Sequence, residues 1–231
     1  MTERILEVVQ AGMVPYAEAL EWQRALARAR IEGQLAHDLL LLLEHPGVVT
    51  LGRGSHAGHV LSSDGVEVFE TERGGDVTFH GPGQLVGYPI LDLTGHKRDL
   101  HWYLRTLEQA LIDALARLGI AAGQSPGYTG VWTSGRKIAS IGIHVKQWVT
   151  LHGFALNVKN DLSQFARIVP CGIAGVEMTS VEREGVGGRG TGDGGLWEQT
   201  VVAVMGGFEA AFGVKAEPID DVERLRPATT S

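Results

Sequence analysis

The sequence feature that most constrains the fold is an uninterrupted run of five leucines at positions 39–43. Asp38 and Glu44 bound this run, and His45-Pro46-Gly47 follows it. A wholly apolar segment of this length between charged residues is typical of a buried strand. It is also far shorter than the ~20 apolar residues that a membrane-spanning helix needs. The sequence therefore predicts a soluble domain built around a covered sheet.

The remaining periodicities place helices beside further strands. Apolar residues spaced by three or four predict helices over 16–34, over 100–118 and from near Trp197 to about Phe212. Asp99 is the expected N-cap of the second helix and Gly119 its C-cap. Pro89 indicates an edge or a bulge in its strand. Strands are predicted at 48–52, 66–71, 84–93, 128–133, 136–145 and 149–158, whereas residues 8–15 show a mixed pattern.

This order of elements predicts an α/β (α+β) fold with a mixed, largely antiparallel sheet flanked by helices. The length of 231 residues fits a single catalytic domain spanning 1–231. Seven of the eleven residues in 185–195 are glycine, and this composition predicts a flexible connector before the last helix.

Charge and cysteine content exclude several classes of protein. The net charge of −7 disfavours general nucleic-acid binding, which needs a basic face. The single cysteine argues against a secreted disulfide scaffold. Glu3 and Glu7 stand where a secretory signal would carry basic and then apolar residues. We therefore expect a cytoplasmic protein with neither a membrane nor a nucleic-acid partner.

Cys171 has no cysteine with which to form an internal disulfide, so its thiol is buried filler, a metal ligand or a nucleophile. Pro170 fixes the backbone before it, and Gly172 permits close backbone approach after it. This context favours a tight turn over a strand interior. From the residues alone, a structural and a functional role both remain open.

Lys137 lies on a predicted strand where small and large aliphatic residues alternate, in GRKIASIG at 135–142. Small residues on one strand face leave space for an apolar chain. A lysine at the mouth of such a groove could favour the thiolate form of a nearby cysteine and exchange a proton with it. The alternative is a solvated surface lysine.

The stretch 73–84 contains four glycines, so its backbone amides could line a site, and Arg73 and His80 add charge and hydrogen bonding. It matches neither a Walker loop nor a dinucleotide fingerprint, so phosphate binding is weakly supported. A structural turn with a satisfied histidine is the alternative interpretation.

Three weaker patterns remain. His144 or His152 could serve Cys171 as a base, although surface or hydrogen-bonded histidines are more common. His56 and His59 have a His-x-x-His spacing, but no third ligand follows at a suitable offset, and we expect no metal site. Residues 123–127 match Gly-x-Ser-x-Gly, but they follow a helix and precede a strand, so we expect a loop.

Several segments together resemble the lipoyl(octanoyl) transferases, which are octanoyl-[acyl-carrier-protein]:protein octanoyltransferases. The most specific is RGGDVTFHGPGQLVGY at 73–88. The resemblance covers about residues 40 to 180. It also rests on EHP at 44–46, TLGRG at 50–54, TGVW at 129–132, GRKIASIG at 135–142, HGFALN at 152–157 and IVPCGI at 168–173.

This resemblance implies a fold like that of the biotin and lipoate protein ligases, and an acyl-enzyme mechanism. Cys171 matches the nucleophile of the family, and Lys137 matches the lysine that tunes it. No cofactor and no metal are implied. The substrate-binding segments of the family match Arg73, Gly74, Gly75, Asp76, Val77, Thr78, Phe79 and His80, then Ser140, Ile141 and Gly142, and then Gly153, Phe154 and Ala155.

The partners implied are octanoyl-acyl-carrier-protein as donor, and as acceptors the lipoyl domains of 2-oxoacid dehydrogenase complexes and the glycine cleavage H protein. Three alternatives remain open. They are an ATP-dependent lipoate or biotin ligase, which shares the fold, a cysteine hydrolase, and a non-catalytic module that binds carrier protein. The sequence leaves open the acyl-chain length, the oligomeric state, the docking surface and the preferred acceptor.

Overall fold

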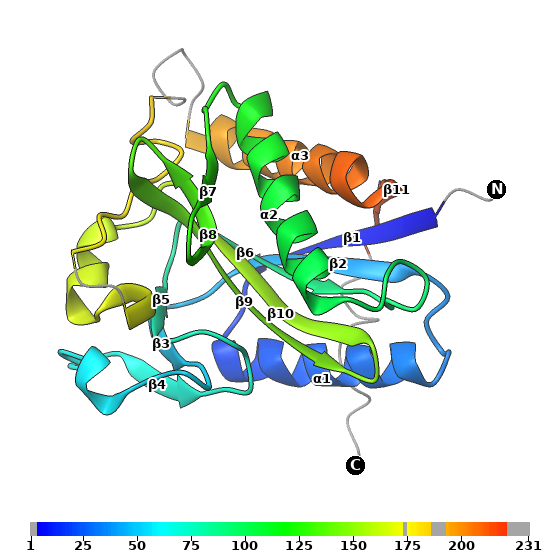
Figure 1. Ribbon diagram of the computed structural model, residues 1–231, viewed down its shortest axis with the longest axis horizontal. Helices are drawn as coiled ribbons and strands as arrows, with labels where there is room; N and C mark the ends of the chain where they lie inside the picture. Colours follow the sequence, from blue (N-terminus) through cyan, green and yellow to red (C-terminus); the bar gives the residue numbers. More distant parts are fainter. Residues whose placement is uncertain (1–3, 173–174, 186–192, 221–231) are drawn as a thin grey trace.

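The computed structural model describes residues 4–172, 175–185 and 193–220 (Figure 1). In chain order its elements are β1 (Arg4–Met13), α1 (Tyr16–Ile31), β2 (Asp38–Glu44), β3 (Val48–Leu51), η1 (Ala57–His59), β4 (Glu67–Glu70), β5 (Thr78–His80), β6 (Gln84–Ile90), α2 (Leu100–Arg117), β7 (Gly123–Ser125), β8 (Tyr128–Thr133), β9 (Arg136–Lys146), β10 (Val149–Asn157), η2 (Leu162–Arg167), η3 (Pro170–Gly172), α3 (Asp193–Phe212) and β11 (Val214–Pro218).

Within the described residues, eight strands form the main sheet in the order β11-β1-β2-β6-β10-β9-β8-β7, and three form a smaller sheet in the order β4-β3-β5. The β11–β1 and β1–β2 pairs are parallel, and every other neighbouring pair in the main sheet is antiparallel. The predicted mixed, largely antiparallel sheet is therefore confirmed.

Strand β2 shows why the sheet is covered on both faces. Leu39, Leu41 and Leu43 pack with residues of α1 in one core cluster. Leu40 and Leu42 point the other way and join a second cluster with residues of α2 and α3. Figure 1 shows the same arrangement, with α2 and α3 side by side over one face and α1 along the opposite face. The run of leucines thus has the buried position that its composition predicts.

The helix ends follow from local chemistry. Asp99 caps α2 because its Oδ1 accepts hydrogen bonds from the backbone N–H groups of His101 and Trp102, as predicted. Leu118 is the C-cap, and Gly119 follows it in the left-handed conformation with φ +79°. Within the described residues, no helix is long and apolar enough to cross a membrane.

Several expectations need correction. Pro89 lies in a central strand, because β6 is placed between β2 and β10. The Thr150 side chain compensates for the proline by donating to the Pro89 carbonyl and accepting from the Leu91 N–H.

Of the expected flexible connector, residues 186–192 lie outside the described residues, whereas residues 193–195 are helical. Strands β1, β5, β7 and β11 were not predicted.

His45 connects the loop between β1 and α1, the end of β2 and strand β6. It is fully buried directly after β2. Its Nδ1 donates to the Val14 carbonyl at 2.7 Å, so its Nε2 accepts the hydroxyl proton of Tyr88, also at 2.7 Å. Burial removes the ring from water and lowers the pKa of His45 to about 4, against the opposing effect of its bond to Val14.

We predict that this histidine makes stability fall in mild acid. Its pKa in the folded state lies below the unfolded value of about 6.5, so below that pH the unfolded chain takes up a proton that the native chain refuses. His45 should cost up to about 3 kcal/mol of unfolding free energy between pH 6.5 and pH 4. Urea unfolding at pH 7 and pH 5 should show a smaller acid-induced loss in His45→Gln than in the unmodified protein.

The exposed His101 on α2 provides the control. His101→Gln should keep the acid-induced loss of the unmodified protein. An equal loss in His45→Gln and in the unmodified protein would contradict the assignment.

Candidate active site

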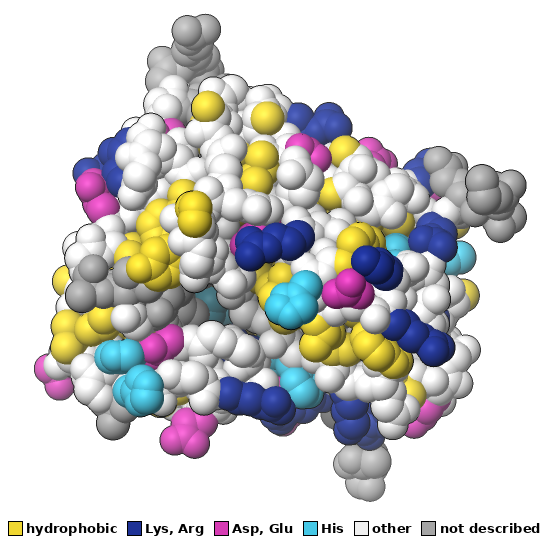
Figure 2. Space-filling model, in the orientation of Figure 1, with side chains coloured by type: hydrophobic (Ala, Val, Ile, Leu, Met, Phe, Trp, Pro, Cys, Tyr) yellow, Lys and Arg dark blue, Asp and Glu magenta, His cyan; other side chains and the backbone are white. Residues whose placement is uncertain are grey.

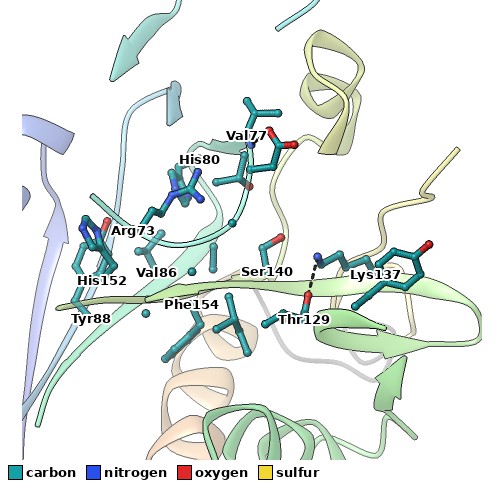
Figure 3. Close-up of a pocket in the computed structure, with 18 of the residues that line it drawn as sticks. Arg73, Val77, His80, Val86, Tyr88, Thr129, Lys137, Ser140, His152 and Phe154 are labelled. Atoms are coloured by element: carbon teal, nitrogen blue, oxygen red, sulfur yellow. Dashed lines mark hydrogen bonds between the residues drawn. The ribbon is translucent and has the colours of Figure 1, made fainter. Parts of the chain in front are cut away.

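A cavity of about 230 Å³ lies between the glycine-rich stretch and strands β9 and β10 (Figure 3). This far exceeds the ~10–15 Å³ that one water molecule needs. Val77, Val86 and Phe154 give it apolar walls. Its lining includes most of the residues that the sequence predicts for the site, namely Arg73, Gly75, Asp76, Val77, Thr78, His80, Lys137, Ser140, Ile141, Gly142, Gly153, Phe154 and Ala155.

Residues 73–75, here called the strap, span the gap between the two sheets. The carbonyl groups of Arg73 and Gly75 accept hydrogen bonds from Arg53 and Gly54, just after β3. The Gly74 N–H points the other way and donates to the Ile143 carbonyl of β9 at 2.8 Å. Gly74 therefore supports the cavity without lining it. Phe79 also does not line it, because its ring packs in the core beneath the small sheet.

Arg73 reaches back from the strap into the small sheet and is mostly buried. Its guanidinium donates to the Thr50 carbonyl at 2.7 Å and to the Thr50 hydroxyl at 3.0 Å. A buried guanidinium needs such acceptors, because an unsatisfied charge in the interior is costly. Arg73 thus fixes the strap to β3 and contributes one wall of the cavity.

Lys137 is 1% exposed, on β9, and lines one end of the cavity. Its Nζ donates to the Thr129 carbonyl at 3.0 Å and lies 5.4 Å from the centre of the Trp132 ring, within cation–π range. Gly130 makes room for this side chain, since a Cβ there would lie 2.8 Å from the Lys137 Cε. The strand lysine is therefore buried beside the cavity and is not a solvated surface residue.

Cys171 lies in the one-turn helix η3, which confirms the expected turn, whereas its side chain lies outside the described residues. The Gly172 backbone rests against the Asp76 carboxylate, where any Cβ would collide. Beyond the turn, the Glu177 carbonyl accepts from the Lys137 N–H at 2.8 Å. The segments flanking Cys171 thus contact both Asp76 and Lys137, the two charged residues at this end of the cavity.

The other end of the cavity is lined by Tyr16, His80, Tyr88 and His152. Burial lowers the pKa of His80 to about 3 and that of His152 to about 4, and the positive charge of nearby Arg73 acts in the same direction on both. Burial also raises the pKa of Tyr16 to about 12. These four side chains are therefore neutral at pH 7, and Arg73 is the charged group beside them (Figure 3).

The histidines considered as bases for Cys171 lie elsewhere. His152 is in β10 at the polar end of the cavity, and Figure 3 shows it at the opposite end from Lys137. His144 lies on β9 and lines a separate surface groove with Arg24 and Lys146. Both ring nitrogens of His80 are within hydrogen-bonding distance of other side chains, Gln84 and Thr50.

Residues 123–127, expected to be a loop, begin with a short strand instead. The Gly-x-Ser-x-Gly stretch forms β7 and the turn into β8, so no strand-to-helix elbow is present there. Among the described residues, no cluster of three His, Cys, Asp or Glu side chains could hold a metal ion.

Sequence reasoning missed several lining residues. Tyr16, Tyr88 and Thr129 line the cavity but were not predicted as site residues. Tyr88 and Thr129 end and begin two of the segments that carry the family resemblance, and this position was the available signal. Tyr16 is the first residue of α1, where an aromatic side chain is typical of an ordinary core position.

Comparison with known proteins agrees with this geometry. Residues 15–188 match the model of the lipoyl protein ligase A/B catalytic domain. An octanoyltransferase of Gloeobacter violaceus is 53% identical over 212 residues, covering 91% of this chain and 92% of the relative. An octanoyltransferase of Solibacter usitatus is 56% identical over 183 residues, covering 77% of this chain and 82% of the relative.

Solved structures show the same fold at low sequence identity. A putative lipoate protein ligase of Thermoplasma acidophilum, Ta0514, superposes with a TM-score of 0.71 at 17% identity, covering 98% of this chain and 93% of that one. A lipoate-protein ligase A bound with ATP superposes with a TM-score of 0.69 at 16% identity, covering 97% of this chain and 93% of that one. The chain belongs to the family of lipoyl protein ligase A/B catalytic domains.

Proposed function

We propose that this enzyme is an acyltransferase of lipoate biosynthesis that moves an octanoyl group from octanoyl-acyl-carrier-protein, through a thioester on Cys171, to a lysine of a lipoyl domain. The single observation that carries the proposal is the extensive identity with octanoyltransferases, at 53% over nearly the whole chain. The cavity with Lys137 at one end supports it. Residues 1–231 would act as one catalytic domain in the cytoplasm.

The cavity suits a medium-length acyl chain. Its apolar walls include Val86, Ile141 and Phe154. Gly142 lets the strap pack against β9, since a Cβ there would lie 2.9 Å from the Gly74 carbonyl oxygen. Burying each methylene group contributes about 0.8 kcal/mol, so an eight-carbon chain gains several kcal/mol from such a slot. Ser140 and Ala155 face each other across β9 and β10 and keep the slot narrow without filling it.

The thiol chemistry follows from the position of Lys137. An ammonium group in a nearly dry environment favours a negative partner, and a thiolate on Cys171 would supply one. The thiolate attacks the carrier-protein thioester, and the pantetheine thiol leaves. The Gly172 and Gly74 N–H groups already donate to the Val169 and Ile143 carbonyls. The Gly75 N–H in the strap is the remaining candidate of these for holding the oxyanion.

No ATP is needed in this sequence of steps. Exchange of one thioester for another is nearly neutral in free energy, and transfer from a thioester to an amide is downhill. An ATP-dependent ligase would instead form an acyl-adenylate and would need no thiol. The two reactions are therefore separated by the donor that each consumes.

The two protein partners would approach the end of the cavity where Lys137 lies. We propose acyl-carrier protein as the donor, and lipoyl domains of 2-oxoacid dehydrogenase complexes and the glycine cleavage H protein as acceptors. Figure 2 shows lysine and arginine side chains spread over the visible face and not gathered in one block. An acidic donor would therefore be attracted by several separate charges.

We predict that Cys171→Ala abolishes the mass gain of one octanoyl group when the protein is mixed with octanoyl-acyl-carrier-protein. Intact-mass spectrometry measures the gain, and the unmodified protein serves as the positive control. A persisting gain, located at another residue by peptide mapping, would contradict the assignment. ATP consumption that depends on free octanoate, without formation of any acyl-enzyme, would favour the ligase instead.

We predict that Lys137→Met slows alkylation of the thiol by iodoacetamide at pH 7. Methionine preserves much of the buried volume but removes the ammonium group, so the thiolate fraction should fall about tenfold for each unit by which the pKa of Cys171 rises. Because Cys171 is the only cysteine, total alkylation reports on it alone. Lys146→Met on the exposed end of β9 is the control, and equal rates in the two variants would remove the tuning role of Lys137.

A further inference from the structure

His59 and Asp76 form a close pair beside the turn that contains Cys171. The His59 Nδ1 lies 2.6 Å from the Asp76 Oδ2. A carboxylate can only accept, so Nδ1 carries the proton and Nε2 is left as the basic nitrogen. The other oxygen, Oδ1, accepts from the Val77 N–H at 2.6 Å. Both ends of the carboxylate are thus held, and the imidazole has one defined tautomer and orientation.

The loop that carries His59 is hydrogen-bonded to the segment that leads into the cysteine turn. The His59 carbonyl accepts from the Val169 N–H at 2.8 Å. Val60 and Ile168 form an antiparallel bridge, and the Leu61 N–H donates to the Arg167 carbonyl. Any movement of the turn would therefore carry His59 with it.

The peptide after Cys171 touches the pair directly. Gly172 adopts φ +67°, and a Cβ at that position would collide with the Asp76 Oδ2 and lie 3.1 Å from the His59 Cε1. The Cα atoms of Cys171 and Gly172 are about 3.8 Å apart, as across any trans peptide bond. The pair is therefore immediately next to the residue that is proposed to hold the acyl group.

Asp76 is the feature at this end of the cavity that could attract a cationic group. Among the described residues that line the cavity it has the only carboxylate, whereas Lys137 and, towards the other end, Arg73 are cationic. A lysine ammonium that entered beside Lys137 alone would be repelled, whereas the carboxylate of Asp76 attracts it. His59 is a quarter exposed at its side chain, so its ring can be reached from outside.

The other candidate bases for this amine are less suitable. His80 has a pKa lowered to about 3 by burial, and both of its nitrogens face hydrogen-bonding partners. His152 lies at the far end of the cavity from Lys137 (Figure 3). A general base must lie within reach of the proton that it removes.

We propose that the His59–Asp76 pair receives the incoming lysine of the acceptor protein, with Asp76 attracting the ammonium group and His59 removing its proton. This inference rests on the proposed octanoyl transfer through Cys171 and adds a second base to it. Positioned histidine bases of this kind typically accelerate a reaction by about 10²–10⁴-fold.

The His59 Nε2 takes one proton from the ammonium, which becomes a neutral amine. The amine lone pair forms the C–N bond at the thioester carbonyl, and the C–S bond breaks with its electron pair going to the Cys171 sulfur. The second N–H proton goes to that thiolate. The products are an amide, a free thiol and an imidazolium, which returns its proton to water.

The test separates the two half-reactions. His59→Gln keeps an amide N–H for Asp76 but has no basic nitrogen. Loading of Cys171 from octanoyl-acyl-carrier-protein should stay within about twofold of the unmodified rate, whereas transfer from the isolated acyl-enzyme to a lipoyl domain should slow by about 10²-fold or more. Asp76→Asn should slow the same second step to a smaller extent.

Hydroxylamine distinguishes a base from a structural role, because it is a neutral nucleophile at pH 7 and needs no proton removed before attack. Acyl-enzyme of His59→Gln should react with hydroxylamine at the unmodified rate. His56→Gln, in the same loop and in edge contact with the His59 ring, is the matched control and should transfer to the lipoyl domain normally.

Two results would overturn the inference: an unchanged rate of transfer to the lipoyl domain in His59→Gln, or an equal slowing with hydroxylamine and with the lipoyl domain. Failure of the unmodified Cys171 to accept any octanoyl group would instead defeat the proposed function. The two failures are therefore distinguishable in one set of measurements.

Discussion

The site depends on one backbone interaction, in which the chain beyond the cysteine turn pairs in parallel with β9 at Lys137. The Lys137 N–H donates to the Glu177 carbonyl, and its own carbonyl accepts from the Thr179 N–H at 2.9 Å. These two bonds join residues about forty positions apart in the chain. The ion pair between Arg136 of β9 and Glu184, at 3.0 Å, also holds the segment after Cys171 against this strand. The proposed chemistry between the Cys171 thiol and the buried ammonium depends on this register.

The cavity separates charge along its length. Lys137 and Asp76 line it at the end near the cysteine turn, whereas the tyrosines and histidines at the other end are neutral because burial suppresses their ionisation. The apolar middle lies between them. The Lys137 ammonium and the Asp76 carboxylate are thus placed where the proposed proton transfer and ion pairing would occur, and Arg73 is the charged group beside the neutral side chains at the other end.

Much of the architecture could be predicted from the sequence. The five leucines of β2 specified a sheet covered on both faces, and Asp99 specified the start of α2. Strand β1 was missed because its pattern is broken by a register shift between Gln10 and Met13, where Gly12 adopts a positive φ. Strand β11 was missed because it is a short, polar edge strand.

The candidate site shows the same division. The glycine-rich stretch and the strand around Lys137 could be recognised, because their composition is unusual for a core. The relation between His59 and Asp76 could not, because seventeen positions separate them and neither position indicates the other. Such a pair exists only once the small sheet has folded against the turn after η2. Contacts of this kind depend on tertiary packing, and no local periodicity in the sequence predicts them.

The strap has a mechanical consequence. Its carbonyl groups are bonded to the end of the small sheet, and its central N–H is bonded to the main sheet. The strap therefore links the two sheets, and Arg73 and Gly75 of the strap also line one wall of the cavity. A displacement of the small sheet would therefore be transmitted through the strap to the wall of the cavity that Arg73 and Gly75 form.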